Sequence, residues 1–120
     1  MSQLIRDYIE FVWNQGRTEE AERFLAKDLI QHNPNLPNGR KPLADFIDGF
    51  RKQFPEARFE IRRLTAEGDL VFIHSLLTVQ PGHRGIAVVD VFRIADGLIA
   101  EHWDLREDVP ETTTSGNDIV

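Results

Sequence analysis

The chain has 120 residues, of which 14 are basic and 20 acidic, giving a formal charge of −6. This length suits one domain with a single hydrophobic core. The acidic balance and the lack of any basic run argue against a nucleic-acid partner, and no apolar stretch is long enough to span a bilayer. Without cysteine there is no disulfide, thiol nucleophile or thiolate metal site. The N-terminus lacks the apolar core of a signal peptide, so we expect a cytoplasmic protein.

Helical spacing of apolar residues dominates the first half of the chain. The pattern predicts helices over residues 2–15, 18–25 and 42–54. Gly16 ends the first of these and Pro55 stops the third, while residues 29–32 favour a short strand. A turn-rich loop over residues 33–39 precedes the third helix.

The second half changes to the alternation of β-strands. Strands are predicted at residues 58–64, 70–79, 86–94 and 98–105, separated by turn residues containing glycine or proline. Helices followed by an antiparallel meander predict an α+β fold, with helices packed on one face of a strongly curved, mainly antiparallel sheet. We expect a single domain over residues 1–108 and a polar C-terminal tail over residues 109–120.

Asp90 interrupts the most apolar strand face in the sequence. Alternation places it on the same side as Ile86, Val88, Phe92 and Ile94. A carboxylate buried among such neighbours must be paired, hydrogen-bonded or protonated. Asp90 is therefore the strongest candidate for a functional role, because aspartate also has poor β-propensity in the middle of a strand.

The last strand carries polar residues on one side and apolar residues on the other. Alternation groups His102 with Asp104, and it groups Ile99, Trp103 and Leu105 on the opposite side. We take the rows of Asp90, His102 and Asp104 to line a concavity covered by the helices. The second apolar face then predicts a homodimer interface, formed by Val89, Val91, Ile99, Trp103 and Leu105.

These patterns give a set of candidate site residues. The catalytic candidates are Asp90, Asp104, His102, His32 and His74, and the ligand-binding candidates are Asn33, Phe46, Phe50, Phe72, Leu76 and Phe92. Plainer roles stay open for two of them. His74 on an apolar face can be a satisfied core residue, and Asp104 can simply end its strand.

Several segments resemble the SnoaL-like polyketide-cyclase branch of the nuclear-transport-factor-two-like superfamily. The likeness extends over nearly the whole chain and is carried by IQHNPN at 30–35, Gly39, GDLVFIH at 68–74, VVDVFR at 88–93, Asp96-Gly97, EHWD at 101–104 and VPE at 109–111. The resemblance implies a cone-shaped α+β fold in which sheet and helices enclose a pocket. It also implies a homodimer through the outer face of the sheet.

The resemblance assigns roles to three positions. Asp90 is similar to the protonated acid of the ketosteroid isomerases, which donates a hydrogen bond to an oxyanion. Their base, an aspartate directly before proline, would fall on Asn33, and an amide is no base. In the polyketide cyclases an aspartate on the last strand is the general acid/base, and Asp104 is the nearest match.

We therefore expect a cofactor-independent acid/base enzyme that acts next to a carbonyl of a small apolar, polyketide-like or cyclic-ketone substrate. Aldol-type cyclisation, isomerisation and dehydration all suit such a set of residues. A module of the same fold that binds a small molecule without chemistry is the alternative. A weaker third hypothesis is a metal site formed by His74, His102 and a carboxylate, although no compact ligand motif supports it, and we expect no metal.

Overall fold

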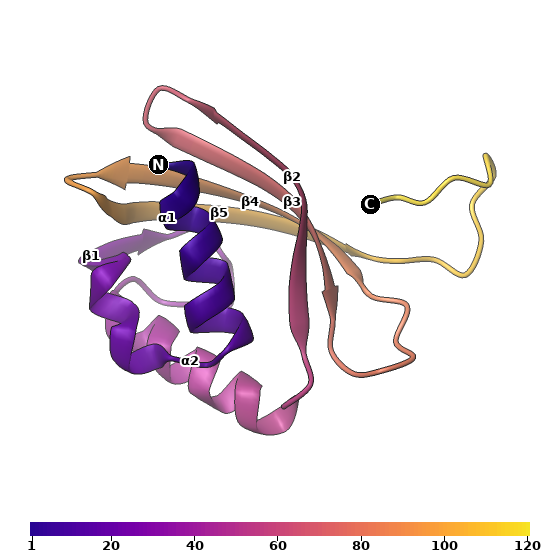
Figure 1. Ribbon diagram of the computed structural model, residues 1–120, viewed down its shortest axis with the longest axis horizontal. Coiled ribbons are helices and arrows are strands. Elements are labelled where there is room, and N and C mark those ends of the chain that lie inside the picture. The colour runs from indigo at the N-terminus through magenta and orange to yellow at the C-terminus, as the bar shows by residue number, and fades with distance from the viewer.

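The chain folds into helical segments and a five-stranded sheet. The computed structural model describes all residues from Met1 to Val120. Figure 1 shows the elements in chain order: α1 (Ser2–Asp7), the π-type helix η1 (Tyr8–Asn14), the 3₁₀ helix η2 (Thr18–Arg23), β1 (Leu25–Gln31), α2 (Arg40–Gln53), β2 (Arg58–Glu67), β3 (Leu70–Thr78), β4 (Ile86–Ala95) and β5 (Leu98–Asp108). None of the helices has the length and apolar character needed to cross a membrane.

The sheet has the strand order β1-β5-β4-β3-β2. Strands β2 to β5 form an antiparallel meander, and β1 pairs in parallel with β5 at the edge. A tight turn joins β4 to β5, in which Asp96 and Gly97 have φ values of 53° and 76°. Asp-Gly pairs favour this left-handed conformation, so the turn fixes which residues of β4 and β5 face each other.

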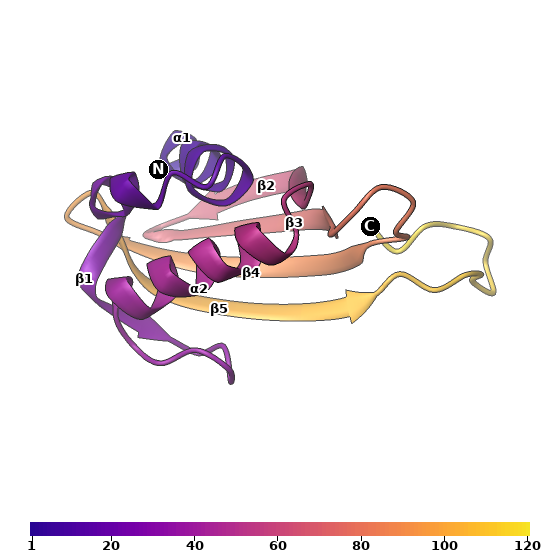
Figure 2. The same cartoon turned by 90° about the horizontal axis from the view of Figure 1, so that it is seen from below.

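The N-terminal helices α1 and η1 and the helix α2 lie on the same side of the curved sheet (Figures 1 and 2). The core between the layers is made of α1, η1 and α2 side chains packed on inward residues of the strands, including Ile5, Val12, Ile47, Val71, Ile73 and Ile99. The predicted α+β architecture is confirmed. The predicted second helix is shorter than expected, because Leu25 pairs with Ile99 and so begins β1.

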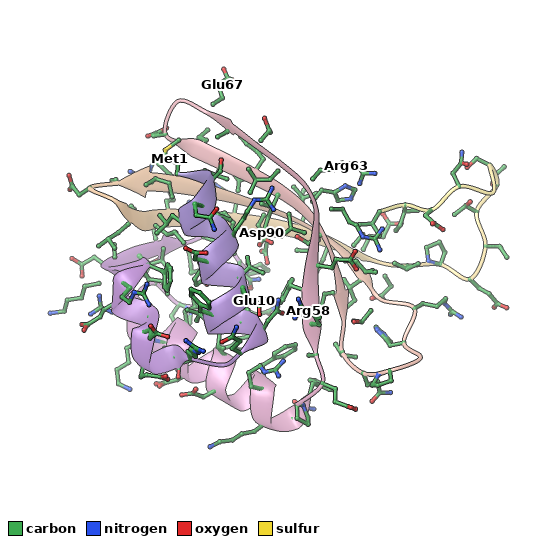
Figure 3. The ribbon with its side chains drawn as sticks, viewed as in Figure 1. Met1, Glu10, Arg58, Arg63, Glu67 and Asp90 are labelled. Carbon is green, nitrogen blue, oxygen red and sulfur yellow. The ribbon has the colours of Figure 1, made fainter.

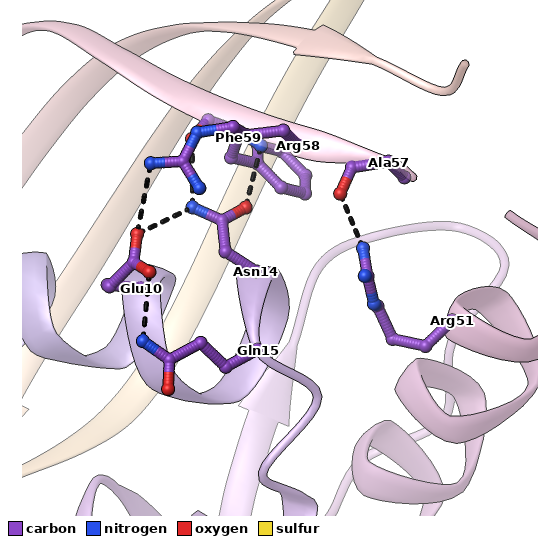
Figure 4. A network of polar contacts seen from close by, with 7 residues as sticks. All are labelled: Glu10, Asn14, Gln15, Arg51, Ala57, Arg58 and Phe59. Carbon is purple, nitrogen blue, oxygen red and sulfur yellow. Dashed lines mark hydrogen bonds and ion pairs between the residues drawn. The ribbon is translucent and has the colours of Figure 1, made fainter. Parts of the chain in front are cut away.

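Asn14 at the end of η1 is hydrogen-bonded to the first residues of β2 (Figure 4). Its Oδ1 accepts from the backbone N–H of Phe59 at 2.8 Å, and its Nδ2 donates to the Phe59 carbonyl at 3.0 Å. Glu10 accepts from Asn14 and also pairs with Arg58 at 3.2 Å. These contacts join the helical layer to the strand that closes one side of the molecule.

A β-bulge in β5 corrects one of the expected interface residues. The pairing with β4 passes from Ile94–Ile99 directly to Arg93–Glu101, so Ala100 has no partner. Because Ala100 is an extra residue, the side chains before it and after it do not follow one continuous alternation between the two faces of the sheet. Ile99 is therefore fully buried in the core, and its prediction as an outer-face residue is wrong. Beyond the bulge, Trp103 and Leu105 occupy the outer face, as register partners of Val91 and Val89.

No regular element follows Asp108. The backbone N–H of Val109 donates to the Gly85 carbonyl, and the Val120 carbonyl accepts from Arg62. Figure 1 shows the tail leaving β5 on the side away from the helices and then turning back toward the sheet. The division into a domain over 1–108 and a separate tail stays a prediction.

Candidate functional site

A cavity of about 670 Å³ lies between the helices and the sheet. Aromatic side chains of η1, of α2 and the residue after it, and of β2 form one wall: Trp13, Phe46, Phe50, Phe54 and Phe59. The opposite wall is the inner face of β4 and β5, which presents Val88, Asp90, Phe92, His102, Asp104 and Arg106. Because one wall is apolar and the other carries ionisable groups, the cavity suits an apolar molecule with a few polar atoms.

Asp90 lies at the centre of the polar wall. It is only 7% exposed, and Figure 3 places it between the N-terminal helix and the sheet. Burial raises the pKa of the Asp90 carboxyl above its ordinary value of 3.8, while the hydrogen bond shared with His102 opposes this rise. The nearby charge of Asp104 raises the Asp90 pKa further. These surroundings favour the protonated form of Asp90.

His102 connects Asp90 to a residue that sequence analysis did not select. The Nε2 of His102 lies 2.8 Å from Asp90 Oδ1, and its Nδ1 lies 2.9 Å from Gln31 Oε1. Because the Gln31 carbonyl can only accept, it favours the tautomer of His102 that carries its proton on Nδ1. The Nε2 of His102 is then free to accept the Asp90 proton. Gln31 and His102 are register partners in β1 and β5. Only that pairing identifies Gln31, because its position in the sequence carries no distinguishing pattern.

Asp104 is the second carboxylate of the site, and Asn33 orients it. The Asn33 side-chain amide donates to both Asp104 oxygens, each at 3.0 Å. Asn33 comes two residues after β1 ends, and its Oδ1 also accepts from the backbone N–H of Asn35. The amide therefore fixes the orientation of the carboxyl group, and both residues line the cavity.

Tyr8 is a further lining residue that the sequence analysis did not select. Its phenol oxygen accepts from Trp13 Nε1 at 2.9 Å, so its own proton is free to donate into the cavity. Burial raises the pKa of Tyr8, and the charge of Asp90 raises it further despite the Trp13 hydrogen bond. Tyr8 is thus a neutral hydrogen-bond donor close to Asp90.

Four of the expected site residues lie outside the cavity. His74, Phe72 and Leu76 are on the outer face of the sheet, because Val71, Ile73, Ser75 and Leu77 take the inner positions of β3. His74 contacts Arg63, which projects away from the helices in Figure 3. Both faces of β3 are apolar, so alternation alone could not decide which one the helices cover. The expectation that these three residues reach the site is wrong.

His32 also lies outside the cavity, where it stacks on Trp103. The ring centroids are 4.7 Å apart and the rings are inclined by 2°. Its Nε2 contacts Glu101 at 2.7 Å, and Glu101 in turn pairs with Arg93 at 2.8 Å. The remaining candidates do come together, since Asp90, His102, Asp104, Asn33, Phe46, Phe50 and Phe92 all line the cavity.

The structure separates the three residues of the metal hypothesis, because His74 and His102 are on opposite faces of the sheet. A different trio, Asp90, His102 and Asp104, has ligand atoms within 4.8 Å of one another. These atoms already bond each other or Asn33, and the protonated form that burial favours at Asp90 is a poor cation ligand.

A mainly antiparallel sheet curved around helices, with a pocket between the layers, defines a protein of the nuclear-transport-factor-two-like superfamily. The chain belongs to the SnoaL-like domain family, whose model matches residues 5–102. The resemblance seen in the sequence is confirmed. Comparison with curated proteins gives no match.

Solved structures share this fold. TsrD from Streptomyces laurentii has 21% identity and a TM-score of 0.75, with 88% of this chain and 87% of that chain covered. A proposed polyketide cyclase from Acidithiobacillus ferrooxidans has 20% identity, a TM-score of 0.75 and coverages of 88% and 86%. A proposed ketosteroid isomerase from Kribbella flavida has 23% identity, a TM-score of 0.74 and coverages of 92% and 80%.

Proposed function

We propose that the protein is a cofactor-independent acid/base enzyme that removes a proton next to a carbonyl of an apolar ligand. One observation carries the proposal: Asp90 and Asp104 are register partners on the same wall of one cavity, in contrasting surroundings. Two carboxyl groups whose environments separate their proton affinities supply an acid and a base at the same pH. Membership of the SnoaL-like family supports this class of chemistry.

Each residue has a distinct role in the proposed reaction. The Asp104 carboxylate, oriented by Asn33, takes the proton from the carbon next to the carbonyl, and the electron pair moves to the carbonyl oxygen. Tyr8 donates a hydrogen bond to the developing oxyanion. The Asp90–His102 pair holds one proton between Oδ1 and Nε2, so it adds no second negative charge beside Asp104 and can supply that proton to the oxygen.

The same enolate leads to either of two products. If its carbon attacks a second carbonyl of the ligand, a ring closes and the proton held by Asp104 passes to the new alkoxide. If Asp104 instead returns the proton at another carbon, the ligand is isomerised. The aromatic wall of the cavity favours a ligand with fused or adjacent rings, because such rings stack on phenylalanine and tryptophan.

Proton exchange tests the first step directly, whatever reaction follows. We expect the protein to accelerate deuterium incorporation next to the carbonyl of 1-tetralone in D₂O, followed by proton NMR. Asp104→Asn removes the base, so the rate falls by about 10²–10⁴-fold. Asp45→Asn, at another carboxylate of the cavity lining, is the control and retains the wild-type rate. No acceleration by wild-type protein that binds the ketone contradicts the enzyme proposal.

A binding module without chemistry is the second candidate. It is favoured by the amide at position 33, whose side chain engages both oxygens of Asp104 and so competes with a substrate proton for them. If the protein is a binding module, 1-tetralone should bind saturably and change the fluorescence of Trp13 in the cavity wall, without any acceleration of deuterium exchange. The exchange and fluorescence measurements together decide between the two candidates.

We also propose that two copies associate through the outer face of the sheet. Register pairing places Phe72, Val91 and Trp103 in one row, and His74, Val89 and Leu105 in the next. Leu105 is 78% exposed and Val89 is 38% exposed, and the helices lie on the other side of the sheet. An apolar face of this kind is normally covered, and a second copy presents the complementary surface.

A further inference from the structure

Arg106 is an exposed residue of the cavity lining, and its positive charge takes part in no ion pair with the protein. It follows His102 and Asp104 at alternate positions on the inner face of β5, and it is the only arginine or lysine in the cavity lining. Arg93 on the outer face of β4 is held by Glu101 at 2.8 Å, whereas Arg106 forms no such ion pair and no hydrogen bond. Its five N–H donors are therefore open to a ligand.

The carboxylates around Arg106 are engaged elsewhere or lie too far away to pair with it. Asp104 is held by Asn33, and Asp90 is in contact with His102. Across the cavity, Asp45 on α2 pairs with Lys41 at 3.0 Å. Asp108 follows Arg106 on the same strand face, outside the cavity lining. Arg106 does lower the pKa of Asp90 through its charge, so it acts electrostatically inside the site.

We propose that the ligand carries a carboxylate, which Arg106 binds at the mouth of the cavity while the rest of the molecule lies against the aromatic wall. This inference rests on the proposed function and names its substrate class: an apolar, ring-bearing carbonyl compound with an acidic substituent. A guanidinium binds a carboxylate through two parallel N–H donors, which neutral substituents cannot match.

The strand geometry adds a distance requirement. Arg106 lies two residues beyond Asp104, and a strand advances about 3.3 Å per residue, so their Cα atoms are roughly 7 Å apart along β5 and the carboxylate binds beyond the proton-transfer site. In a protein with a net charge of −6, this single cation is also what allows an anion to enter the cavity. Arg106 thereby fixes which end of the ligand reaches Asp104.

Two ligands that differ only in charge test the proposal. 2-Naphthylacetic acid and its carboxamide have the same ring system, and their binding is followed by Trp13 fluorescence above the pKa of the acid. Trp103→Phe is used as the background so that Trp13 is the only tryptophan. We expect the acid to bind about ten-fold more tightly than the amide, as a charge-assisted pair requires. Arg106→Gln abolishes that preference and leaves amide binding unchanged.

Arg6→Gln is the matched control, since it removes one positive charge from an exposed position of α1 outside the cavity lining. It retains the preference for the acid, and Arg106→Lys retains part of it. Equal binding of acid and amide by the wild type, or an unchanged preference in Arg106→Gln, overturns the inference and leaves the proposed function standing. If neither compound binds, the apolar-ligand pocket itself is contradicted, and the inference fails with it.

Discussion

Asp90 and Asp104 face each other across β4 and β5, and their carboxyl groups share a cavity while having different partners. Asp90 contacts an imidazole in an apolar setting, whereas Asp104 accepts two hydrogen bonds from an amide. Burial, and the nearby charge of Asp104, raise the pKa of Asp90 and so favour its protonated form.

Asp90→Asn should lower the exchange rate of 1-tetralone by about 10²-fold, because an amide holds no transferable proton. The fold should persist, since the substituted amide resembles the neutral acid in size and in hydrogen bonding. NMR exchange rates measure the loss and circular dichroism checks the fold. Asp69→Asn, in an exposed turn, is the control. An undiminished rate in Asp90→Asn would refute the role of Asp90.

The raised pKa of Asp90 predicts a pH-dependent contribution to stability. A carboxyl with a higher pKa in the folded state stabilises the fold fully below its ordinary value of 3.8, and this contribution is lost as the pH rises through the folded-state pKa. The unfolding free energy of wild type minus that of Asp90→Asn should therefore fall with increasing pH. Urea titrations across the acid range measure it, and a constant difference contradicts the shift.

Gln31 should determine which nitrogen of His102 carries the proton. In the wild type, ¹⁵N NMR of His102 should show Nδ1–H, with Nε2 facing Asp90. Gln31→Leu removes the acceptor, so the tautomer changes and the ketone exchange rate falls by about ten-fold or more. Gln31→Glu restores an acceptor and recovers the Nδ1–H tautomer. A purely structural role for Gln31 would leave the His102 tautomer unaltered in both variants.

Leu105→Arg should convert the proposed dimer to a monomer, because it places a charge in the apolar outer face. Leu105 is 78% exposed in a single chain, so the fold itself should tolerate the change. Trp103→Arg should act in the same direction while also removing the stacked His32 contact. Sedimentation velocity gives the oligomeric state, with Lys52→Glu on α2 as the control. A dimer that survives both substitutions places the interface elsewhere.

Asn14→Ala should destabilise the protein by about 1–3 kcal/mol, because it leaves the Phe59 backbone groups without their partners. Gln15→Ala removes only an exposed side-chain contact to Glu10 and should change stability far less. Chemical denaturation of both variants gives the two free energies. Similar losses for the pair would show that the Asn14 contacts add nothing specific.

The strands of the second half were predictable because glycine turns and alternation coincide there. The Asp96-Gly97 turn, for example, follows β4 and sets its pairing with β5. The short elements of the first half were harder. Leu25 fits a helical stripe as well as a strand, and only its pairing with Ile99 decides between the two.

The candidate site was predictable wherever one strand face had a clear partner, as at Asp90 and Asp104. His74 was misplaced because β3 is apolar on both sides, so its two faces look alike in sequence. His32 was misplaced because it follows the end of β1, where alternation no longer holds. Tyr8 and Gln31 needed the packing of three separate elements, which spacing within one segment does not encode.

The unpaired Ala100 makes β5 tolerant of the loss of one residue. Because the pairing passes from Ile94–Ile99 directly to Arg93–Glu101, removal of Ala100 would restore simple alternation and leave both pairs in place. His102, Asp104 and Arg106 would still face the cavity, and Trp103 and Leu105 would still face the surface that the second copy is proposed to cover. Loss of a single codon at this point would thus straighten the strand without exchanging its two faces.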